Sequence, residues 1–392
     1  MPQAPRKDRT ILTHAGNDPQ ANHGIVNPPI YRASTVLYPT VREMDERGRQ
    51  KFDTVYYGRY GTPTTFALEA AVAELEEADR AVALPSGLGA VAGALLSCLK
   101  TGDHLLMVDS AYEPTRSFCD RQLAGFGIST TYYDPLIGAG IADLIQSNTR
   151  VVFLESPGSH TFEFQDVPAI AAAAHAKGCL VLLDNTWATP LFFKPFRHGV
   201  DLSIHAATKY IAGHSDVMLG IITMKETHYK QIKTHVHGMG FAVSPDDCYL
   251  ALRGLRTMSA RLSQHQQTAL ALAHWLKGRP EVDRVLHPVM PDHPGHAFWK
   301  RDYSGATGLF GIVLKPFADE RVTAMLDGMQ IFGMGFSWGG YESLMIRSHL
   351  NHARSVTKWS PGGPTLRLHA GLEDPQDLIA DLEAGFARLR GN

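Results

Sequence analysis

The sequence predicts an α/β fold in which a large domain, with a mainly parallel sheet between helices, precedes a smaller C-terminal α+β domain. From residue 81 to residue 206, short apolar strands alternate with helical segments. Such alternation is typical of a parallel sheet that helices cover on both faces. Beyond residue 255, strands and helices are mixed without this alternation, and 392 residues suffice for two domains.

The large domain is expected to cover residues 61–254 and to follow an N-terminal arm, residues 1–60, that lacks the pattern of a packed core. Its first helix is expected at residues 64–78. The pattern is indistinct between residues 219 and 254. The alternating elements are strands 81–84, 104–108, 151–154, 179–183 and 201–206, and helices 88–99, 114–124 and 167–177.

A long amphipathic helix, Leu255 to Lys277, is expected to lead into the small domain, residues 255–392. The remainder of that domain mixes both kinds of element, as an α+β domain does. The predicted elements are strands 309–314, 343–347 and 365–370, and helices 319–328 and 375–389.

Composition indicates a soluble globular enzyme. The net charge of −2 gives no electrostatic reason to expect nucleic acid or an anionic membrane as partner. Four scattered cysteines fit a reducing compartment, and the first ten residues lack the apolar stretch of a secretory signal, so we expect a cytoplasmic protein. The uncharged stretch 81–99 is broken by Pro85-Ser-Gly87, which indicates a buried strand, turn and helix rather than a membrane span.

Lys209 lies in a segment that is otherwise apolar or hydroxylic. Residues 201–207 are predicted as a strand and residues 213–216 as a loop, so the lysine stands at the end of an element. Desolvation without nearby carboxylates favours the neutral, nucleophilic amine that Schiff-base chemistry requires. Taken alone, this segment is better explained by an ordinary surface lysine. The residues described next favour a catalytic lysine instead.

Asp184 ends the apolar strand that precedes the strand before Lys209. Ligands of such sheets bind at the carboxyl ends of the strands, so the two side chains are expected to converge. An acid and a lysine in one crevice suit pyridoxal phosphate, because the lysine forms the imine and the acid keeps the pyridine nitrogen protonated. The alternative is an aspartate that caps the next element.

A helix that begins near Ser86-Gly-Leu88 offers a site for the phosphate of that cofactor, because helix N-termini with a glycine turn bind anions. Tyr112 follows the next strand and is placed to stack on the ring. The same glycines suit a second interpretation. Gly87, Gly89 and Gly93, with Asp109 at the end of the next strand, resemble a nicotinamide dinucleotide fingerprint and leave an NAD(P)-dependent dehydrogenase as an alternative.

Two further motifs indicate other chemistry. Gly335-Phe-Ser337-Trp-Gly339 matches the nucleophile elbow of serine hydrolases, but a strand is predicted after it where the elbow requires a helix. His287, His293 and His296 suggest a metal site, although they lack the spacing of a zinc motif, and packed or surface histidines are the favoured interpretation. No metal is expected.

Over residues 13–389 the sequence resembles the cystathionine β-lyase branch of the Cys/Met-metabolism family of pyridoxal-phosphate enzymes. The resemblance implies a fold-type I enzyme with a seven-stranded sheet in its large domain, and a homotetramer built from dimers. It rests on Tyr57-Gly-Arg59, Ala111-Tyr-Glu-Pro114, Phe153-Leu-Glu-Ser-Pro-Gly-Ser159, Asp184-Asn-Thr-Trp187, Ala207-Thr-Lys-Tyr210, Gly213-His-Ser-Asp216, Ser337-Trp-Gly-Gly-Tyr-Glu-Ser343 and Arg367-Leu-His-Ala-Gly-Leu-Glu373.

The resemblance assigns roles around the cofactor ring. Lys209 is implied as the lysine that forms the Schiff base and shuttles the proton, with Tyr112 as its helper and as the stacked tyrosine. Asp184 is implied as the partner of the pyridine nitrogen, and Thr186 as a further cofactor contact. Pyridoxal 5'-phosphate is therefore the expected cofactor.

The resemblance also assigns the phosphate and the substrate. Gly87, Leu88 and Thr208 are implied as phosphate contacts, and Tyr57 with Arg59 as a pair that reaches the phosphate in the neighbouring subunit. A second set is implied on the substrate side, where a guanidinium suits the α-carboxylate. This set is Ser337, Trp338 and Arg367.

Four positions depart from related sequences. Ala206 replaces a phosphate-binding serine, and Ser159 replaces the asparagine of γ-acting relatives, which matches the β-lyase branch. Tyr60 replaces a second arginine, and His237 replaces a tyrosine, so the group at the far end of the substrate is open.

The expected reaction is the α,β-elimination of L-cystathionine to homocysteine, pyruvate and ammonia, as in methionine biosynthesis. Within the family, a γ-lyase or γ-synthase activity or a β-lyase for another cysteine S-conjugate remains an alternative. Outside that reaction class, the sequence leaves open an NAD(P)-dependent dehydrogenase and a non-catalytic regulator on the same scaffold.

Overall fold

The large domain is built on a seven-stranded sheet with strand order β1-β7-β6-β5-β4-β2-β3. A computed structural model describes residues 6–350 and 353–391 of the chain, so residues 1–5 of the predicted arm lie outside it. Only β7 runs antiparallel to its neighbours, which confirms a mainly parallel sheet. The strands are β1 (Arg80–Leu84), β2 (His104–Val108), β3 (Ser129–Tyr133), β4 (Thr149–Glu155), β5 (Leu180–Asp184), β6 (Leu202–His205) and β7 (Gly220–Met224).

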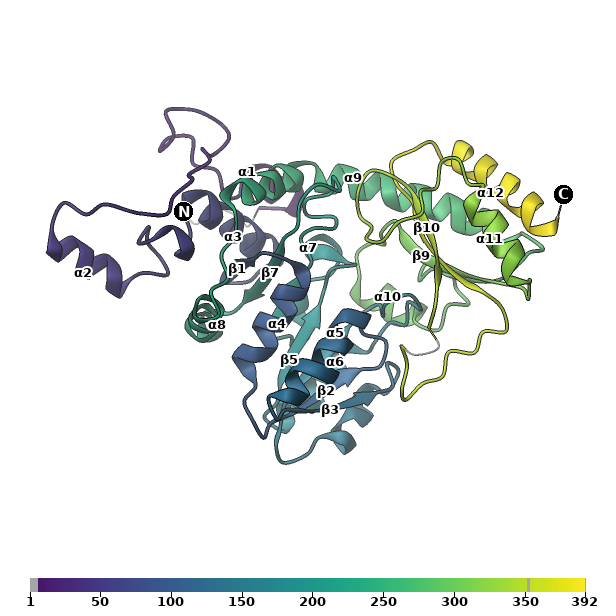
Figure 1. The fold of residues 1–392 in the computed structure, drawn as a ribbon, viewed down its shortest axis with the longest axis horizontal. Coiled ribbons are helices and arrows are strands. Elements are labelled where there is room, and N and C mark those ends of the chain that lie inside the picture. The colour runs from purple at the N-terminus through teal and green to yellow at the C-terminus, as the bar shows by residue number, and fades with distance from the viewer. Residues whose placement is uncertain (1–5, 351–352, 392) are drawn as a thin grey trace.

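Helices pack on both faces of this sheet, because its strands are apolar on both sides. One face carries α4, which contacts β1, β6 and β7, and the other carries α3, which contacts β1 and β7 (Figure 1). The helices are α1 (Asp8–His14), α2 (Val41–Arg49), α3 (Pro63–Glu76), α4 (Gly87–Cys98), α5 (Glu113–Phe118), α6 (Val167–Ala176), α7 (Thr189–Phe192) and α8 (Glu226–Gly238).

The small domain has a four-stranded antiparallel sheet of order β10-β11-β9-β8, with α11 and α12 packed together beside it (Figure 1). This arrangement matches the predicted α+β domain. Its elements are β8 (Val282–Leu286), α10 (His296–Asp302), β9 (Leu309–Leu314), α11 (Asp319–Asp327), β10 (Leu344–Ser348), β11 (Thr365–His369) and α12 (Pro375–Arg390).

The helix α9 (Pro245–Lys277) joins the two domains and begins earlier than predicted from Leu255. Ser244 caps its N-terminus through the N–H of Asp246, and Pro245 suits the first turn, where no N–H is needed. The first half of α9 packs in a core with α1 and α3, whereas Leu272 and the residues around it belong to the core of the small domain. The predicted boundary at residues 254/255 therefore lies inside a continuous helix.

The stretch 81–99 forms the predicted buried strand, turn and helix as β1 and α4. Each helix that the structure describes is either too short or too polar to span a bilayer.

Within the N-terminal arm, α1 packs against α3 and α9 with Ile11 and Leu12 buried, whereas the part that carries α2 extends away from the large domain (Figure 1). None of the residues of α2 is buried. Large apolar side chains on the arm are exposed, with Leu37 at 87% and Val26 at 68%. These side chains therefore contribute nothing to the core of this chain.

Candidate active site

The candidate active site lies where the carboxyl ends of β5 and β6 meet the N-terminus of α4 and a loop of the small domain. Lys209, which follows β6, donates a hydrogen bond of 2.6 Å from Nζ to Ser337 Oγ. The same nitrogen lies 5.5 Å from the ring centre of Trp338. Burial, reinforced by the positive charge of Arg367, lowers the pKa of Lys209 to about 8. A substantial part of the amine is therefore neutral near physiological pH, in agreement with the prediction.

Arg367 reaches the site from β11. Its Nη2 donates a hydrogen bond of 2.9 Å to the carbonyl of Ser337. Burial lowers the pKa of this guanidinium to about 10, so it is still charged at neutral pH. A desolvated cation beside Lys209 is suited to bind a carboxylate through its remaining N–H groups.

Asp184 and Glu155 end neighbouring parallel strands, with paired Cα atoms. Asp184 lies near enough to Lys209 for its charge to oppose the lowering of the lysine pKa, so the predicted convergence occurs. Burial raises the pKa of Asp184, and burial together with the charge of Asp184 raises that of Glu155 well above its usual range. Glu155 is therefore the weaker acid of the two.

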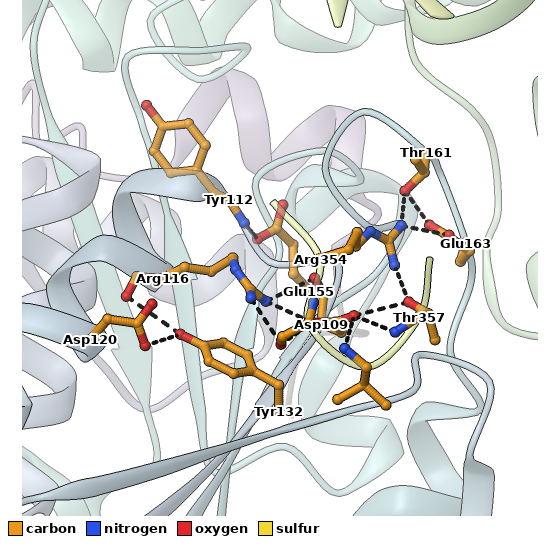
Figure 2. Close-up of polar contacts among 12 residues, drawn as sticks. Asp109, Tyr112, Arg116, Asp120, Tyr132, Glu155, Thr161, Glu163, Arg354 and Thr357 are labelled. Atoms are coloured by element: carbon orange, nitrogen blue, oxygen red, sulfur yellow. Dashed lines mark hydrogen bonds and ion pairs between the residues drawn. The ribbon is translucent and has the colours of Figure 1, made fainter. Parts of the chain in front are cut away.

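Tyr112 precedes α5, and its backbone N–H donates a hydrogen bond of 2.7 Å to Glu155 Oε2, as Figure 2 shows. Its side chain is 46% exposed and therefore free to cover a ligand. Burial of the hydroxyl raises the pKa of Tyr112, and a negative charge on Glu155 would raise it further. The tyrosine is thus a neutral hydrogen-bonding group at neutral pH. Glu155, for which sequence analysis predicts no role, fastens Tyr112 to the sheet.

The N-terminus of α4 provides a cradle for a phosphate. Ser86 accepts the N–H of Gly89 with its side chain and the N–H of Ala90 with its carbonyl. The N–H groups of Gly87 and Leu88 precede the intrahelical bonds and are therefore available to an anion. A Cβ atom at Gly87 would lie 2.5 Å from the Cβ of Ala206, so only glycine allows this approach of helix and strand end. With an amine and an acid beside it, this donor set fits pyridoxal phosphate.

The two predicted threonines are bound to backbone groups. Thr186 Oγ1 accepts the N–H of Ala206 at 2.8 Å, and its own N–H donates to Asp184 Oδ1 at 3.0 Å. Thr208 Oγ1 accepts the N–H of Leu219 at 2.9 Å and lies 3.2 Å from the carbonyl of the same residue. Both hydroxyls therefore fix the strand ends in this structure, and their contacts with a cofactor stay predictions.

Tyr57 and Arg59 lie on the arm rather than beside Lys209. Arg59 donates a hydrogen bond of 2.8 Å to the carbonyl of His237, and its guanidinium lies 4.7 Å from the ring centre of Tyr60. Within the described part of this chain, no hydrogen bond joins either residue to Lys209 or to α4. Their proposed contact with a neighbouring subunit stays a prediction.

The surroundings of Asp109 do not fit the nicotinamide dinucleotide fingerprint. Asp109, which would have to face a ribose, is 0% exposed. Its carboxylate accepts hydrogen bonds from Arg116 and from the backbone and hydroxyl groups of residues 355–357 (Figure 2). Both oxygens of Asp109 are thus engaged within the protein rather than turned toward a ligand.

The serine-hydrolase motif is a coincidence of sequence. Ser337 Oγ faces Lys209, and the next regular element is the strand β10, not a helix. His369 is the nearest candidate base, but its Nε2 accepts the N–H of Gly339 at 3.1 Å. Burial lowers the pKa of His369 to about 3, so this imidazole is neutral.

The three histidines of the suspected metal motif bond to local backbone groups. Nδ1 of His287 accepts the N–H of Val289, and Nδ1 of His293 accepts that of Gly295. Nδ1 of His296 lies 2.9 Å from the carbonyl of Pro288. Across residues 6–350 and 353–391, no group of three or more His, Cys, Asp or Glu side chains is arranged to hold a metal ion.

Comparison with known proteins agrees with this site. Residues 9–387 match the family described as Cys/Met metabolism PLP-dependent enzyme. The chain is 50% identical to a Rhizobium johnstonii protein over 96% of this chain and 95% of the relative. It is 43% identical to the cystathionine β-lyase MetC of Escherichia coli, over 98% of this chain and 100% of the relative.

A solved structure gives the same result. The fold matches the cystathionine γ-synthase of Xanthomonas oryzae pv. oryzae, solved with aminoacrylate and cysteine, at a TM-score of 0.91 and 32% identity. The match covers 99% of this chain and 100% of that chain. The predicted fold class is thereby confirmed.

Proposed function

The chain belongs to the Cys/Met-metabolism family of PLP-dependent enzymes, and we propose that it is a carbon–sulfur β-lyase that cleaves L-cystathionine to homocysteine, pyruvate and ammonia. The observation that carries this proposal is the meeting of Lys209, Asp184 and Arg367 beside the free N–H groups of α4. Full-length relatives named cystathionine β-lyase support the β-carbon as the point of cleavage.

Groups from four parts of the site would hold the cofactor. Lys209 would hold it through its amine, the N–H groups of Gly87 and Leu88 would bind its phosphate, and Tyr112 would cover the ring. Asp184 would keep a proton on the ring nitrogen, because Glu155 is the weaker acid of these two carboxyls. Pyridoxal phosphate, when bound, supplies a conjugated ring that takes up the electron pair left by the departing α-proton.

Arg367 orients the substrate by binding its α-carboxylate. The hydrogen bond to the Ser337 carbonyl fixes the guanidinium, so little side-chain entropy remains to be lost on binding. Once the amino group of the substrate has replaced Lys209 on the cofactor, the released neutral amine of Lys209 would take the proton from Cα, and the thiolate would leave from Cβ. Water completes the release of pyruvate and ammonia.

The arm supports a proposal about assembly. Its exposed apolar side chains, and the position of Tyr57 and Arg59 away from Lys209, suit an arm that completes the site of a second copy. We propose a homotetramer built from such dimers. The four cysteines are free, which supports a reducing cytoplasmic compartment.

The test is the 2-oxoacid that purified, cofactor-loaded protein forms from L-cystathionine. Pyruvate with homocysteine is the expected result. Formation of 2-oxobutyrate with cysteine would place cleavage at the γ-carbon, and formation of no oxoacid would point to another cysteine S-conjugate. In that last case, Tyr60 and His237 are the first residues to examine for substrate choice.

A further inference from the structure

A second buried carboxylate, that of Glu76 at the end of α3, lies behind the candidate site. Glu76 is 0% exposed. Its Oε1 accepts hydrogen bonds from His205 Nε2 at 2.8 Å, Asn185 Nδ2 at 2.8 Å and Ser203 Oγ at 2.9 Å. Its Oε2 accepts the hydroxyl of Thr223. The proposed mechanism uses none of these residues.

This cluster lies on the face of the sheet opposite to Asp184. Asp184 pairs with Ile204, and successive side chains of a strand point to opposite faces. Ser203 and His205, the neighbours of Ile204, therefore point away from the face of Asp184. Thr223 pairs with Ser203 on the same face. One carboxylate thus binds side chains from the ends of β5 and β6 and from β7.

The strand ends that Glu76 holds are those that carry the site. Asn185 directly follows Asp184. His205 directly precedes Ala206, whose N–H bonds to Thr186 Oγ1 and whose carbonyl accepts the N–H of Lys209 at 3.0 Å. A shift of Asn185 or His205 would therefore displace the groups proposed to hold the cofactor.

The groups around Glu76 also keep its carboxylate ionised. Burial alone would raise the pKa of Glu76, but the charge of His205 and the hydrogen bonds from His205, Thr223 and Asn185 outweigh it, so the pKa is lowered. Glu76 is accordingly an anion at neutral pH. Burial raises the pKa of Asp184, whereas the positive charge of His205 lowers it. His205, which Glu76 binds, is thus one of the groups that lower the pKa of Asp184.

We propose that Glu76 is a positioning residue for the cofactor. From the far face of the sheet, its carboxylate fixes Asn185 and His205 and so sets the position of Asp184. This inference rests on the proposed role of Asp184 as partner of the ring nitrogen.

The test is Glu76→Gln, which keeps the shape of the side chain and removes its charge. The dissociation constant of pyridoxal phosphate should rise about tenfold or more, since one charge-assisted contact is lost. It is measured by equilibrium dialysis of the cofactor-free protein against the cofactor. The visible absorption band of the bound cofactor should shift as well. A purely structural role would change only the midpoint of unfolding.

Glu69→Gln is the matched control. Glu69 lies on the same helix, is buried, and binds Lys233 Nζ at 3.0 and 3.1 Å and the N–H of Ala83 at 2.9 Å. Ala83 lies in β1 and Lys233 in α8, so these contacts do not involve the ends of β5 and β6. The Glu69→Gln variant should lose stability while it keeps the wild-type cofactor affinity and absorption band.

Asp184→Asn separates the two proposals. If Asp184→Asn leaves affinity and absorption unchanged, the proposed role of Asp184 fails, and the inference fails with it. If Asp184→Asn changes both but Glu76→Gln changes neither, only the inference is overturned. Should Glu76→Gln not fold, Asn185→Ala replaces it. That variant removes one of the two contacts through which Glu76 is proposed to act, and unchanged cofactor affinity in it would equally overturn the inference.

Discussion

Lys209 Nζ donates a hydrogen bond of 2.6 Å to Ser337 Oγ, so a lysine of the large domain and a hydroxyl of the small domain meet in one site. The backbone of Ser337 is left-handed, with φ of 74°. Such a conformation costs a serine about 1–2 kcal/mol. Arg367, through the Ser337 carbonyl, and His369, through the N–H of Gly339, hold the loop in place. The strain at Ser337 thus accompanies the placement of its hydroxyl at the amine.

The first prediction concerns the pKa of Lys209 in cofactor-free protein. Because burial and Arg367 lower that pKa to about 8, labelling of Lys209 by an amine-selective reagent should reach half its maximal rate near pH 8. Exposed lysines should do so near pH ~10.4. Peptide mass spectrometry across the pH range gives both values from one sample.

The same pKa shift of Lys209 predicts how the stability of the cofactor-free protein changes with pH. The unfolded chain binds the Lys209 proton more tightly than the folded chain does, so this residue lowers stability below pH 8 and the loss disappears as the pH rises toward 10.5. Lys209→Met should therefore stabilise the cofactor-free protein at pH 7 and much less at pH 10. A Lys209 labelling profile that matches the surface lysines would contradict the prediction.

The second prediction concerns Arg367. Arg367→Ala should raise KM for L-cystathionine by roughly 10- to 100-fold, because a hydrogen bond to a charged group contributes about 1.5–3 kcal/mol. Arg367→Lys should recover only part of this loss, since an ammonium keeps the charge but lacks the planar fork of donors. Steady-state kinetics of the three proteins provides the comparison. An unchanged KM in Arg367→Ala would exclude the carboxylate contact.

The third prediction concerns shared sites. Lys209→Ala and Arg59→Ala homo-oligomers should each be nearly inactive. If Arg59 serves the neighbouring subunit, a hybrid dimer has one site with both changes and one intact site. Random exchange of equal amounts should then restore about a quarter of the wild-type activity. A mixture that stays inactive after exchange, verified by native mass spectrometry, would place Arg59 in its own subunit's site.

The order of elements could be predicted from sequence because alternation of apolar strands with helices has few structural solutions. The missed strands show where such reasoning stops. β7 (Gly220–Met224) is a five-residue apolar run without alternation, and β3 (Ser129–Tyr133) is an edge strand rich in threonine and tyrosine. Runs this short do not distinguish strand from other buried chain until their partners are known.

Some residues of the candidate site could also be predicted from the sequence, and others could not. Lys209 and Asp184 were predictable because each ends an apolar element, which is a local signal. Glu155, by contrast, matters because β4 pairs with β5 and brings it beside Asp184. Glu76 looks like any other glutamate of an amphipathic helix, and only its burial beneath His205 reveals its contacts. Residues whose role depends on tertiary neighbours leave no pattern in a single sequence.

The fourth prediction concerns Asp109, which fastens residues 355–357 of the small domain to the large domain. Asp109→Asn should lower the free energy of unfolding by about 2–4 kcal/mol, because Arg116 is left buried without its charged partner. The midpoint in denaturant should fall with an unchanged slope. Glu163→Gln, which weakens the neighbouring contact with Arg354, is the matched comparison.

The pKa of Asp109 also predicts how its contribution to stability depends on pH. Burial opposes ionisation of Asp109, but hydrogen bonds from residues 355–357 outweigh it and lower the pKa from 3.8 to about 2. The stabilisation is complete above pH 4 and is lost as the pH falls toward 2. The difference between wild type and Asp109→Asn should therefore shrink over that interval. A constant difference would show that the charge of Asp109 is not responsible.

The last prediction uses the contact between Gly87 and Ala206. Alanine is favoured over glycine in a helix by about 1 kcal/mol, so propensity alone would make Gly87→Ala harmless. Yet its Cβ would lie 2.5 Å from the Cβ of Ala206, and the start of α4 would have to move away from β6. Gly87→Ala should therefore weaken binding of pyridoxal phosphate by about tenfold or more, because the N–H groups that cradle the phosphate are displaced.

A second substitution makes this test specific. Gly87→Ala/Ala206→Gly removes the 2.5 Å contact but leaves the new Cβ 2.9 Å from the Cα of residue 206, so the double variant should regain part of the lost affinity. In Gly89→Ala the new Cβ would come closest to Ser86 Oγ, at 3.1 Å, and the affinity should change little. Equilibrium dialysis of all three proteins decides the matter. If Gly87→Ala keeps the wild-type affinity, the phosphate is bound elsewhere than at the start of α4.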